Sequence, residues 1–542
     1  MNQLQTADYI VFFVYFIAVS SYGYNVYHKK KTKSISSQDF FLAEGSLTWW
    51  AIGASLIASN ISAEHFIGMS GSGFALGLAI ASYEWMAAAT LIIVAIFIIP
   101  VYLKNKIFTM PQFLSKRYND KVSTIMAVFW LLVYVFVNLT SIIYLGALAI
   151  SSISNISFEW CIVGLSVFSM VVTLGGMKVI GYTDVIQVLV LIIGGLITTY
   201  LALSLLSREY GFGDDIFQGL SILRKEAPTH FHMIFDSSHK YYKELPGLSV
   251  LIGGMLINNL AYWGCNQYIV QRALGADLPT ARKGILFAAF LKLLVPVIAV
   301  LPGIVMYVLH NKGLFHAEMS DGGLIKPDHA YPTLMNLLPA GLKGIAFAAL
   351  TAAIVASLAG KANSISTIFS MDIYKKYFNK DAPDRKMVIV GRWAVVISMI
   401  IAAIVAPALK SLEQAYQFIQ EYVGFISPGV LAIFLLGLFW KRTTAAAAMA
   451  GALLTIPIST VLKFLPLWTN GAFPDIPFLN RMAIDFVLLI LIMVIMSLAK
   501  PQKDNDPHTV EVDTSMFKIS TGFAIGSVLI MGILTALYTI FW

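Results

Sequence analysis

The sequence predicts an all-α polytopic membrane protein with about 14 transmembrane helices. Of its 542 residues, 58% are hydrophobic and 12% are charged, whereas soluble proteins carry about 25% charged residues. Apolar runs of about 17–25 residues, the length that crosses a bilayer, recur along the whole chain. Basic residues gather in alternate connections between these runs, as expected of loops that face the cytoplasm.

The apolar spans are expected, in chain order, at 8–28, 46–69, 75–103, 122–150, 157–176, 182–206, 246–269, 284–310, 338–374, 389–409, 414–440, 443–464, 482–499 and 519–542. The first is long enough to span and is followed by lysines, which favours a retained helix over a cleaved signal peptide. Two long connections, about 207–245 and 311–337, contain apolar patches, so short helices are expected over the outer face.

Charge placement predicts the topology. The basic connections begin with Lys29, Lys30, Lys31 and Lys33 and end with Lys500, Lys503 and Lys518, whereas the short opposite loops carry only Lys410 and Arg481. The basic connections therefore mark the cytoplasm, which places both termini outside a cell membrane. This topology accounts for the net charge of +8 without nucleic acid as a partner. Both cysteines lie in apolar stretches, which argues against a disulfide framework or a zinc site.

Polar residues interrupt the second span in the stretch "SNISAEHFIGMSGSG". One helical face is formed by Ala58, Ile61, Ser62 and His65, with Asn60 beside it. Three glycines follow and weaken the helix. We therefore expect a broken helix, whose exposed backbone carbonyls suit a small cation.

The seventh span repeats this pattern in "GGMLINNLAYWGCNQ", where Asn259, Tyr262, Trp263 and Asn266 share a face. The spacing between the two stretches predicts two five-helix halves of inverted topology, each opening with a broken helix around a midplane site. The chain then divides into a first helix and cytoplasmic loop (1–45), a first half (46–206), an outer loop (207–245), a second half (246–440) and C-terminal helices (441–542).

Further polar residues fall inside apolar spans: Glu84, Asn138, Asp184, Lys292, Ser357, Lys361, Gln420 and Glu421. A charge at mid-membrane costs at least ~2.5–3.5 kcal/mol, so these side chains should face the protein interior. Ordinary roles remain open for several of them. Asn138 and Ser357 also fit simple interhelical hydrogen bonds, and Glu421 fits a side chain that reaches the interface. Glu84 and Lys292 lie deep in their spans and are candidates for function.

Several motifs identify a family resemblance: "GASLIASNISAEHFIGMSGSGFALGLAIASYEWM", "NLAYWGCNQYIVQR", "FAAFLKLLVP", "NSISTIFSMDIYK" and "FIQEYVGFISPGVLAIFLLGLFWK". They closely resemble the sodium/solute symporter family and its SGLT-type sodium/sugar cotransporters, over almost the whole chain. The resemblance implies a LeuT-type 5+5 inverted repeat with flanking helices. It also implies sodium-coupled import of a hexose-type sugar by alternating access, and no enzymatic activity.

The resemblance further implies a sugar site made of Asn60, Ser62, His65, Glu84, Asn138, Asn259, Lys292 and Gln420. Such a set suits a pyranose, because carboxylate, ammonium and amide groups together match hydroxyls that donate and accept. The gate residues implied are Met69, Tyr83 and Tyr416 on the outer side, and Tyr262 and Trp263 on the inner side. His65 and Ala87 depart from the galactose-type relatives, where Gln and a hydroxyl residue are expected.

The implied sodium site departs from the family pattern as well. Its carbonyls would come from Ala58, Ile61 and Ala353, and its hydroxyls from two consecutive residues, which here are Ala356 and Ser357. One hydroxyl is therefore absent. Lys361 shares a helix face with Ser357 and has three possible roles: an ion pair with Asp184, which matches the family's sodium exit route; partial replacement of the ion; or snorkelling to the cytoplasm.

Sodium coupling is favoured because the rest of that site is intact. A sodium-independent or proton-coupled sugar carrier of the same fold is the first alternative, and a sugar-binding membrane sensor is the second. The sequence shows no nucleotide-binding loop, metalloprotease helix or nucleophile elbow, so neither ATP nor an intramembrane enzyme is expected. The motifs do not distinguish a hexose from inositol.

Overall fold

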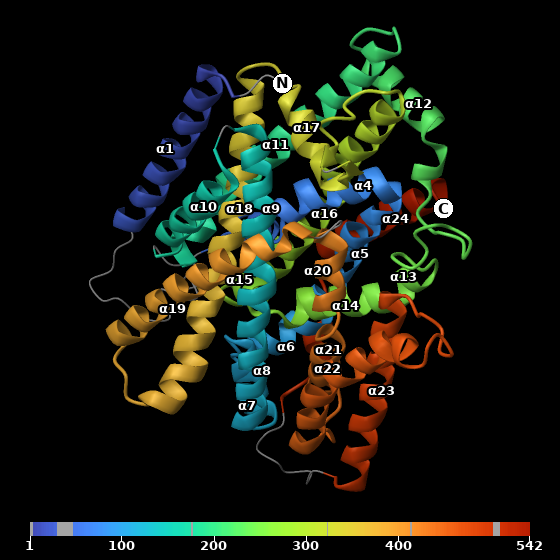
Figure 1. Ribbon diagram of the computed structural model, residues 1–542. Helices are drawn as coiled ribbons and strands as arrows, with labels where there is room; N and C mark the ends of the chain where they lie inside the picture. The colour runs from blue at the N-terminus through green and yellow to red at the C-terminus, as the bar shows by residue number, and fades with distance from the viewer. Residues whose placement is uncertain are drawn as a thin grey trace.

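The computed structural model describes residues 4–29, 47–154, 156–174, 177–321, 323–411, 415–501 and 510–542 (Figure 1). Within these ranges, nine helices are long and apolar enough to cross a membrane, and a bent pair of helices supplies a tenth candidate. These helices confirm an all-α polytopic protein. The first basic loop, with Lys30, Lys31 and Lys33, lies outside the described residues, as does Lys503.

The chain begins with α1 (Thr6–Lys29), α3 (Trp49–Asn60), η2 (Glu64–Met69), α4 (Ser70–Leu76), η3 (Gly77–Ala81), α5 (Ser82–Ile93), η4 (Val94–Ile98) and α6 (Ile99–Lys104). It continues with α7 (Met110–Arg117), α8 (Asp120–Leu132), η5 (Val133–Leu139), α9 (Thr140–Ile153), α10 (Phe158–Thr173) and α11 (Met177–Glu209). The next elements are α12 (Ile216–Glu226), η6 (Pro228–Phe231), α13 (Ser249–Ile252), α14 (Gly254–Cys265), α15 (Gln267–Leu274) and α16 (Leu278–Asn311).

A two-stranded antiparallel ribbon follows, formed by β1 (Ser320–Asp321) and β2 (Leu324–Ile325), with Ser320 opposite Ile325. After it come η7 (Pro327–His329), α17 (Ala330–Asn336), α18 (Leu342–Thr367), η8 (Ile368–Phe378), α19 (Asp384–Val405) and η9 (Ala406–Ser411). The last elements are α20 (Ala415–Val423), α21 (Ser427–Phe439), α22 (Ala445–Trp468), α23 (Phe478–Ala499), η10 (Thr514–Phe517) and α24 (Thr521–Ile540). The short helices expected in the two long connections are confirmed by α12 and α17.

The predicted break in the second span is confirmed. Helix α3 ends at Asn60, and Ile61 has extended backbone angles (φ −71°, ψ 126°). The Ile61 N–H still donates to the Ile57 carbonyl at 2.8 Å, but the next donor, the Ser62 N–H, bonds to Nδ1 of His65 at 3.3 Å. The helical hydrogen-bond ladder therefore stops before the Ala58 carbonyl receives its bond, which leaves that carbonyl available to a ligand.

The predicted break in the seventh span is confirmed too. Asn266 separates α14 from α15 and is extended (φ −99°, ψ 124°). Its side-chain oxygen accepts a hydrogen bond from the Tyr134 hydroxyl on η5. One predicted span, 414–440, proves to be two helices, because α20 and α21 meet at 43°.

Helix α16 holds both pieces of the broken second span. It packs on α3, α4, α5 and α11. A Cβ atom at Gly53 of α3 would lie 2.6 Å from the Gly284 carbonyl of α16, and one at Gly73 of α4 would lie 2.6 Å from the Val300 carbonyl. Both contacts therefore need glycine, as in close helix packing within membranes. This packing brings Lys292 of α16 beside the break.

Helix α1 lies on one side of the molecule, with α22 and α23 toward the other (Figure 1). It is joined to the start of α18 by the buried Asp8. The Asp8 Oδ1 atom accepts hydrogen bonds from the N–H groups of Gly341 at 2.7 Å and Gly344 at 2.9 Å. A carboxylate at a helix N-terminus satisfies backbone donors that would otherwise lack partners.

Candidate functional site

A cavity lined by polar and aromatic side chains lies beside the two breaks. Its lining comes from both halves of the predicted repeat: Asn60, Glu64, His65, Tyr83, Glu84, Ala87, Asn138, Asn258, Asn259, Tyr262, Trp263, Tyr268, Lys292, Tyr416, Ile419, Gln420 and Val423. Every residue predicted for the sugar site except Ser62 lines this cavity. Of the predicted gate residues, Met69 is buried outside the lining and the other four belong to it.

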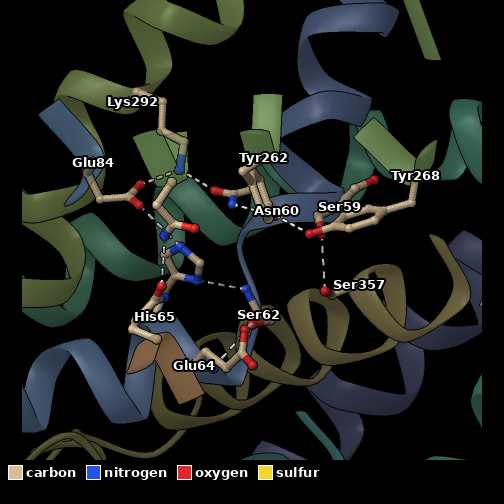
Figure 2. Close-up of polar contacts among 12 residues, drawn as sticks. Ser59, Asn60, Ser62, Glu64, His65, Glu84, Tyr262, Tyr268, Lys292 and Ser357 are labelled. Atoms are coloured by element: carbon tan, nitrogen blue, oxygen red, sulfur yellow. Dashed lines mark hydrogen bonds and ion pairs between the residues drawn. The ribbon is translucent and has the colours of Figure 1, made fainter. Parts of the chain in front are cut away.

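A buried ion pair forms one wall of the cavity (Figure 2). Lys292 donates hydrogen bonds to Oε2 of Glu84 and to the side-chain oxygen of Asn60. The second carboxylate oxygen, Oε1 of Glu84, lies 3.3 Å from Nε2 of His65. The side chains of Lys292 and Glu84 are 0% and 5% exposed. A charge pair removed from water in this way is tolerated when both partners are hydrogen-bonded, as they are here.

The hydrogen bonds of His65 indicate its tautomer. Its Nδ1 accepts from the Ser62 N–H, so the ring proton resides on Nε2 and is donated to Glu84. This arrangement needs only the neutral imidazole. His65 therefore links the helix break to the carboxylate on α5.

Aromatic residues form another wall. The Tyr262 hydroxyl receives hydrogen bonds from Nδ2 of Asn60, at 2.9 Å, and from the Tyr268 hydroxyl (Figure 2). The Tyr262 and Trp263 rings meet edge to face at 5.2 Å, and the Lys292 ammonium lies 5.2 Å from the Trp263 ring centroid. The cavity thus combines charged groups with flat apolar surface.

Two further aromatic rings belong to the predicted outer gate. Tyr83 of α5 and Tyr416 of α20 are buried and pack edge to face, with ring centroids 5.5 Å apart. They connect elements that are distant in the sequence. Because both rings line the cavity, a shift of either helix would change its closure.

The amide residues are arranged differently from the sequence-based expectation. Asn258, which the sequence did not single out, donates to Gln420 at 3.3 Å and accepts from the Ser427 hydroxyl at 2.8 Å. The predicted residue Asn259 bonds to the Met255 carbonyl of its own helix, at 3.1 Å. Both asparagines line the cavity. Adjacent residues of a helix point about 100° apart, so the sequence alone did not indicate that both amides reach this cavity.

Glu64 and Tyr268 were also missed as lining residues. The Glu64 carboxylate accepts from the Ser141 hydroxyl at 2.5 Å and from the Ser62 hydroxyl at 3.3 Å. Its place in the polar stretch after Asn60 could have indicated this role. Asn138 bonds to the Val133 carbonyl of its own helix at 3.3 Å, although it faces the cavity.

The predicted ion site lies where α18 touches the first break. The Ser357 hydroxyl donates to the Ser59 carbonyl at 3.1 Å (Figure 2). Ala58, Ile61, Ala353 and Ala356 are all buried in this region. Backbone carbonyls at a helix break and a hydroxyl are the oxygen ligands that a small hard cation prefers. The Ala356 methyl group supplies no oxygen, so the set fits sodium with one ligand fewer than the family pattern.

Of the three roles considered for Lys361, the ion pair with Asp184 is not formed. Asp184 accepts from the Ser55 hydroxyl at 2.5 Å and lies 3.7 Å from Nη2 of Arg272, while Nε of Arg272 donates to Ser55 at 2.8 Å. The interface position considered for Lys361 is wrong as well, because its side chain is buried, with 1% exposure. By its position at the end of an apolar span, Arg272 is expected among the cytoplasmic charges. Helix α15 follows the break at Asn266, and its residue Arg272 is buried. The Arg272 guanidinium, and not the Lys361 ammonium, therefore pairs with Asp184.

A model of the Sodium:solute symporter family matches residues 40–455. The chain belongs to this family. It is 48% identical to the sodium/glucose cotransporter of Vibrio parahaemolyticus, over 99% of both chains. It is 33% identical to the sodium/myo-inositol cotransporter 2 of Mus musculus, over 86% of this chain and 71% of the relative.

The fold is similar to that of a Na⁺-coupled sialic acid symporter solved in a substrate-bound outward-open state. The TM-score is 0.76 at 21% identity, over 92% of this chain and 99% of the solved one. Family membership confirms the resemblance found in the sequence. The chain is therefore a multi-pass sodium-coupled membrane transporter and not an enzyme.

Proposed function

We propose that this symporter imports a hexose-type sugar by alternating access, with both termini outside the cell membrane. The single observation that carries the choice of substrate is the Glu84–Lys292 pair, bridged to Asn60 and His65 in the wall of the cavity. The charges of Glu84 and Lys292 balance each other, and the fixed donors and acceptors of this cluster suit a ring covered with hydroxyls. The names of the relatives, glucose and myo-inositol cotransporters, fit the same chemical class.

In this proposal, Glu84 accepts hydrogen bonds from sugar hydroxyls, Lys292 donates to them, and the amides of Asn60, Asn259 and Gln420 do both. Tyr262 and Trp263 provide the face against which the apolar side of the ring packs. Asn258 orients Gln420 by donating a hydrogen bond to its side-chain oxygen. Glucose and galactose are the primary candidates, and myo-inositol is the second because it presents the same ring of hydroxyls.

Coupling to sodium follows from the position of Asn60. This sugar ligand lies between Ala58 and Ile61, whose carbonyls would bind the ion together with Ala353 and Ser357. An ion that ties α18 to the break also fixes the backbone that carries Asn60. Each ligand then favours the same arrangement of the break, and this shared preference couples the two binding events.

Alternating access would arise from the two halves, 46–206 and 246–440, as inverted repeats of a LeuT-type fold within a bundle of about 14 helices. Each half contributes one break, and residues next to each break line the cavity. Tyr83 and Tyr416 would close its outer side, with Met69 behind them. Tyr262 and Trp263 would close the inner side, and sodium would leave past Asp184.

Uptake into proteoliposomes at clamped potential tests this function. Labelled glucose, galactose and myo-inositol are offered with sodium, potassium or choline outside. Faster uptake of a hexose in sodium supports the proposal. Equal uptake in all three cations would point to the sodium-independent or proton-coupled carrier. Binding of sugar without counterflow would point to a sensor.

A further inference from the structure

Lys361 is a buried ammonium group that the proposed transport cycle has not yet used. It lies on α18, one helical turn beyond Ser357, with 1% of its surface exposed. Its Nζ donates to the Ser357 hydroxyl oxygen at 2.8 Å and lies 4.9 Å from the ring centroid of Tyr268. Across the described ranges of the chain, it forms no ion pair with a carboxylate. A buried charge without an ion partner costs free energy, so this position of Lys361 is expected to serve a function.

The nearby carboxylates are already engaged. Asp184 is held by Ser55 and Arg272. Glu64 is held by Ser141 and Ser62. Lys361 is therefore a second cation beside this part of α3. Arg272 pairs with Asp184, whereas Glu64 has only hydroxyl partners and favours the Lys361 charge from beyond ion-pair distance.

The direction of the Ser357 hydrogen bonds shows that Lys361 uses the lone pair of the Ser357 hydroxyl oxygen. The Ser357 hydroxyl gives its proton to the Ser59 carbonyl at 3.1 Å, so its oxygen lone pair points to Lys361. A sodium ion at the predicted site needs that same lone pair. Ammonium and sodium cannot share it, since two positive charges a few ångströms apart repel strongly in a low-dielectric interior.

We propose that the Lys361 ammonium is a tethered cation that occupies the ion site when sodium is absent and that sodium must displace. The proposal rests on the proposed function, because it takes the sodium site and the sugar site as given. The methyl group of Ala356 favours the lysine, since sodium has lost one oxygen ligand there. The Tyr268 ring, 4.9 Å from the ammonium, stabilises the charge in this position through a cation–π contact.

This arrangement has a consequence for sugar binding. When sodium is absent, Lys361 still holds Ser357, and Ser357 still holds the end of α3 next to Asn60. The sugar site therefore keeps its shape in sodium-free medium. The protein should therefore bind sodium weakly, and sodium should raise its affinity for sugar less than it does in a variant that lacks the Lys361 ammonium.

The test uses the purified full-length protein and two measurements, ²²Na⁺ binding and labelled glucose binding in sodium or choline. In Lys361→Met, the sodium Kd should fall at least tenfold, and glucose affinity in choline should fall at least fivefold because the tethered cation is gone. In Ala356→Ser, sodium should also bind more tightly, but glucose affinity in choline should stay, since Lys361 remains. Lys343→Met removes another buried lysine of α18, bonded to the Asn336 carbonyl at 2.9 Å, and should change neither quantity.

An unchanged sodium Kd and unchanged glucose affinity in choline for Lys361→Met would overturn the proposal. Lys361→Gln repeats the measurement with an uncharged side chain that can still donate to Ser357, which covers a failure of the methionine variant to fold. Sodium binding that is absent in the wild type and restored by either variant would support the proposal. Failure of the wild type and of every variant to bind sodium would overturn the proposal. Failure of wild-type protein to bind any glucose, with sodium binding behaving as stated, would instead reject the proposed sugar.

Discussion

Asn60 and Lys292 are joined by a hydrogen bond across 232 positions of sequence, from the end of α3 to the middle of α16. The same amide donates to Tyr262, so one asparagine connects the helix break to both the ion pair and the aromatic wall. Lys292 uses two of its three N–H donors, for Asn60 and Glu84, so a sugar hydroxyl bound to its third donor would join this same group of hydrogen bonds. Sugar binding and the geometry of the break are therefore linked through a single side chain.

Removing the Glu84 carboxylate should weaken sugar binding. Glu84→Ala is expected to lose about 1.5–3 kcal/mol of binding free energy, the scale of a hydrogen bond to a charged group. It also leaves Lys292 without its ion partner. Isothermal titration with glucose measures the loss, and Glu159→Gln, which alters an exposed carboxylate paired with Lys410, is the control. Near-wild-type affinity in Glu84→Ala would remove Glu84 from the sugar site.

Changing His65 should alter the choice of sugar more than the rate of transport. His65→Gln keeps a donor toward Glu84 and an acceptor toward the Ser62 N–H, so the break should remain intact. The ranking of glucose, galactose and mannose in competition uptake is expected to shift. If the ranking stays the same while uptake is normal, His65 only supports the helix break.

Breaking the buried pair between Asp184 and Arg272 should destabilise the protein. Asp184→Ala leaves a buried guanidinium without its carboxylate, which is expected to cost about 3–5 kcal/mol. Arg272→Met in the same chain should recover a large part of that loss. Thermal unfolding in detergent, followed for both single variants and the double variant, measures the coupling. Simple additivity of the two single losses would show that the pair contributes nothing as a unit.

Asp8 should stabilise the packing of α1 on α18. Asp8→Ala removes two hydrogen bonds to the start of α18 and is expected to lower stability by about 1–3 kcal/mol. A drop in the detergent melting temperature checks this, with the exposed Asp381→Ala as the control. Sodium and glucose affinities should stay near wild type, because the contact is distant in the chain from the cavity residues. A melting temperature equal to that of the control would contradict the assigned role.

The sequence identified the residues whose chemistry conflicts with a membrane. The two helix breaks were predictable because polar residues and glycines interrupt apolar runs, and Glu84 and Lys292 because charges deep in such runs need a partner. The arrangement of Arg272 was not predictable from its neighbours in sequence. A basic residue near the end of an apolar span looks like a cytoplasmic charge until the break at Asn266 redirects α15.

The bend between α20 and α21 was also missed, although Gly424 and Pro428 fall close to it. A continuous apolar run does not show where two helices change direction, because the angle depends on what packs against them. Asn258 was missed for a similar reason. Which of two adjacent amides meets Gln420 depends on the rotation of α14 about its axis, and only the packed structure fixes that rotation.

Helix α16 carries Pro296 between its two glycine-mediated contacts with the broken second span. Gly284 lies before this proline and contacts α3 at Gly53, while Val300 lies after it and contacts α4 at Gly73. Proline removes one backbone hydrogen bond and so makes a helix easier to bend at that point. A bend of α16 at Pro296 would therefore move α3 relative to α4 and open or close the gap between them. Helix α16 and the broken second span would then act together as one hinge, with Lys292 close to the point of bending.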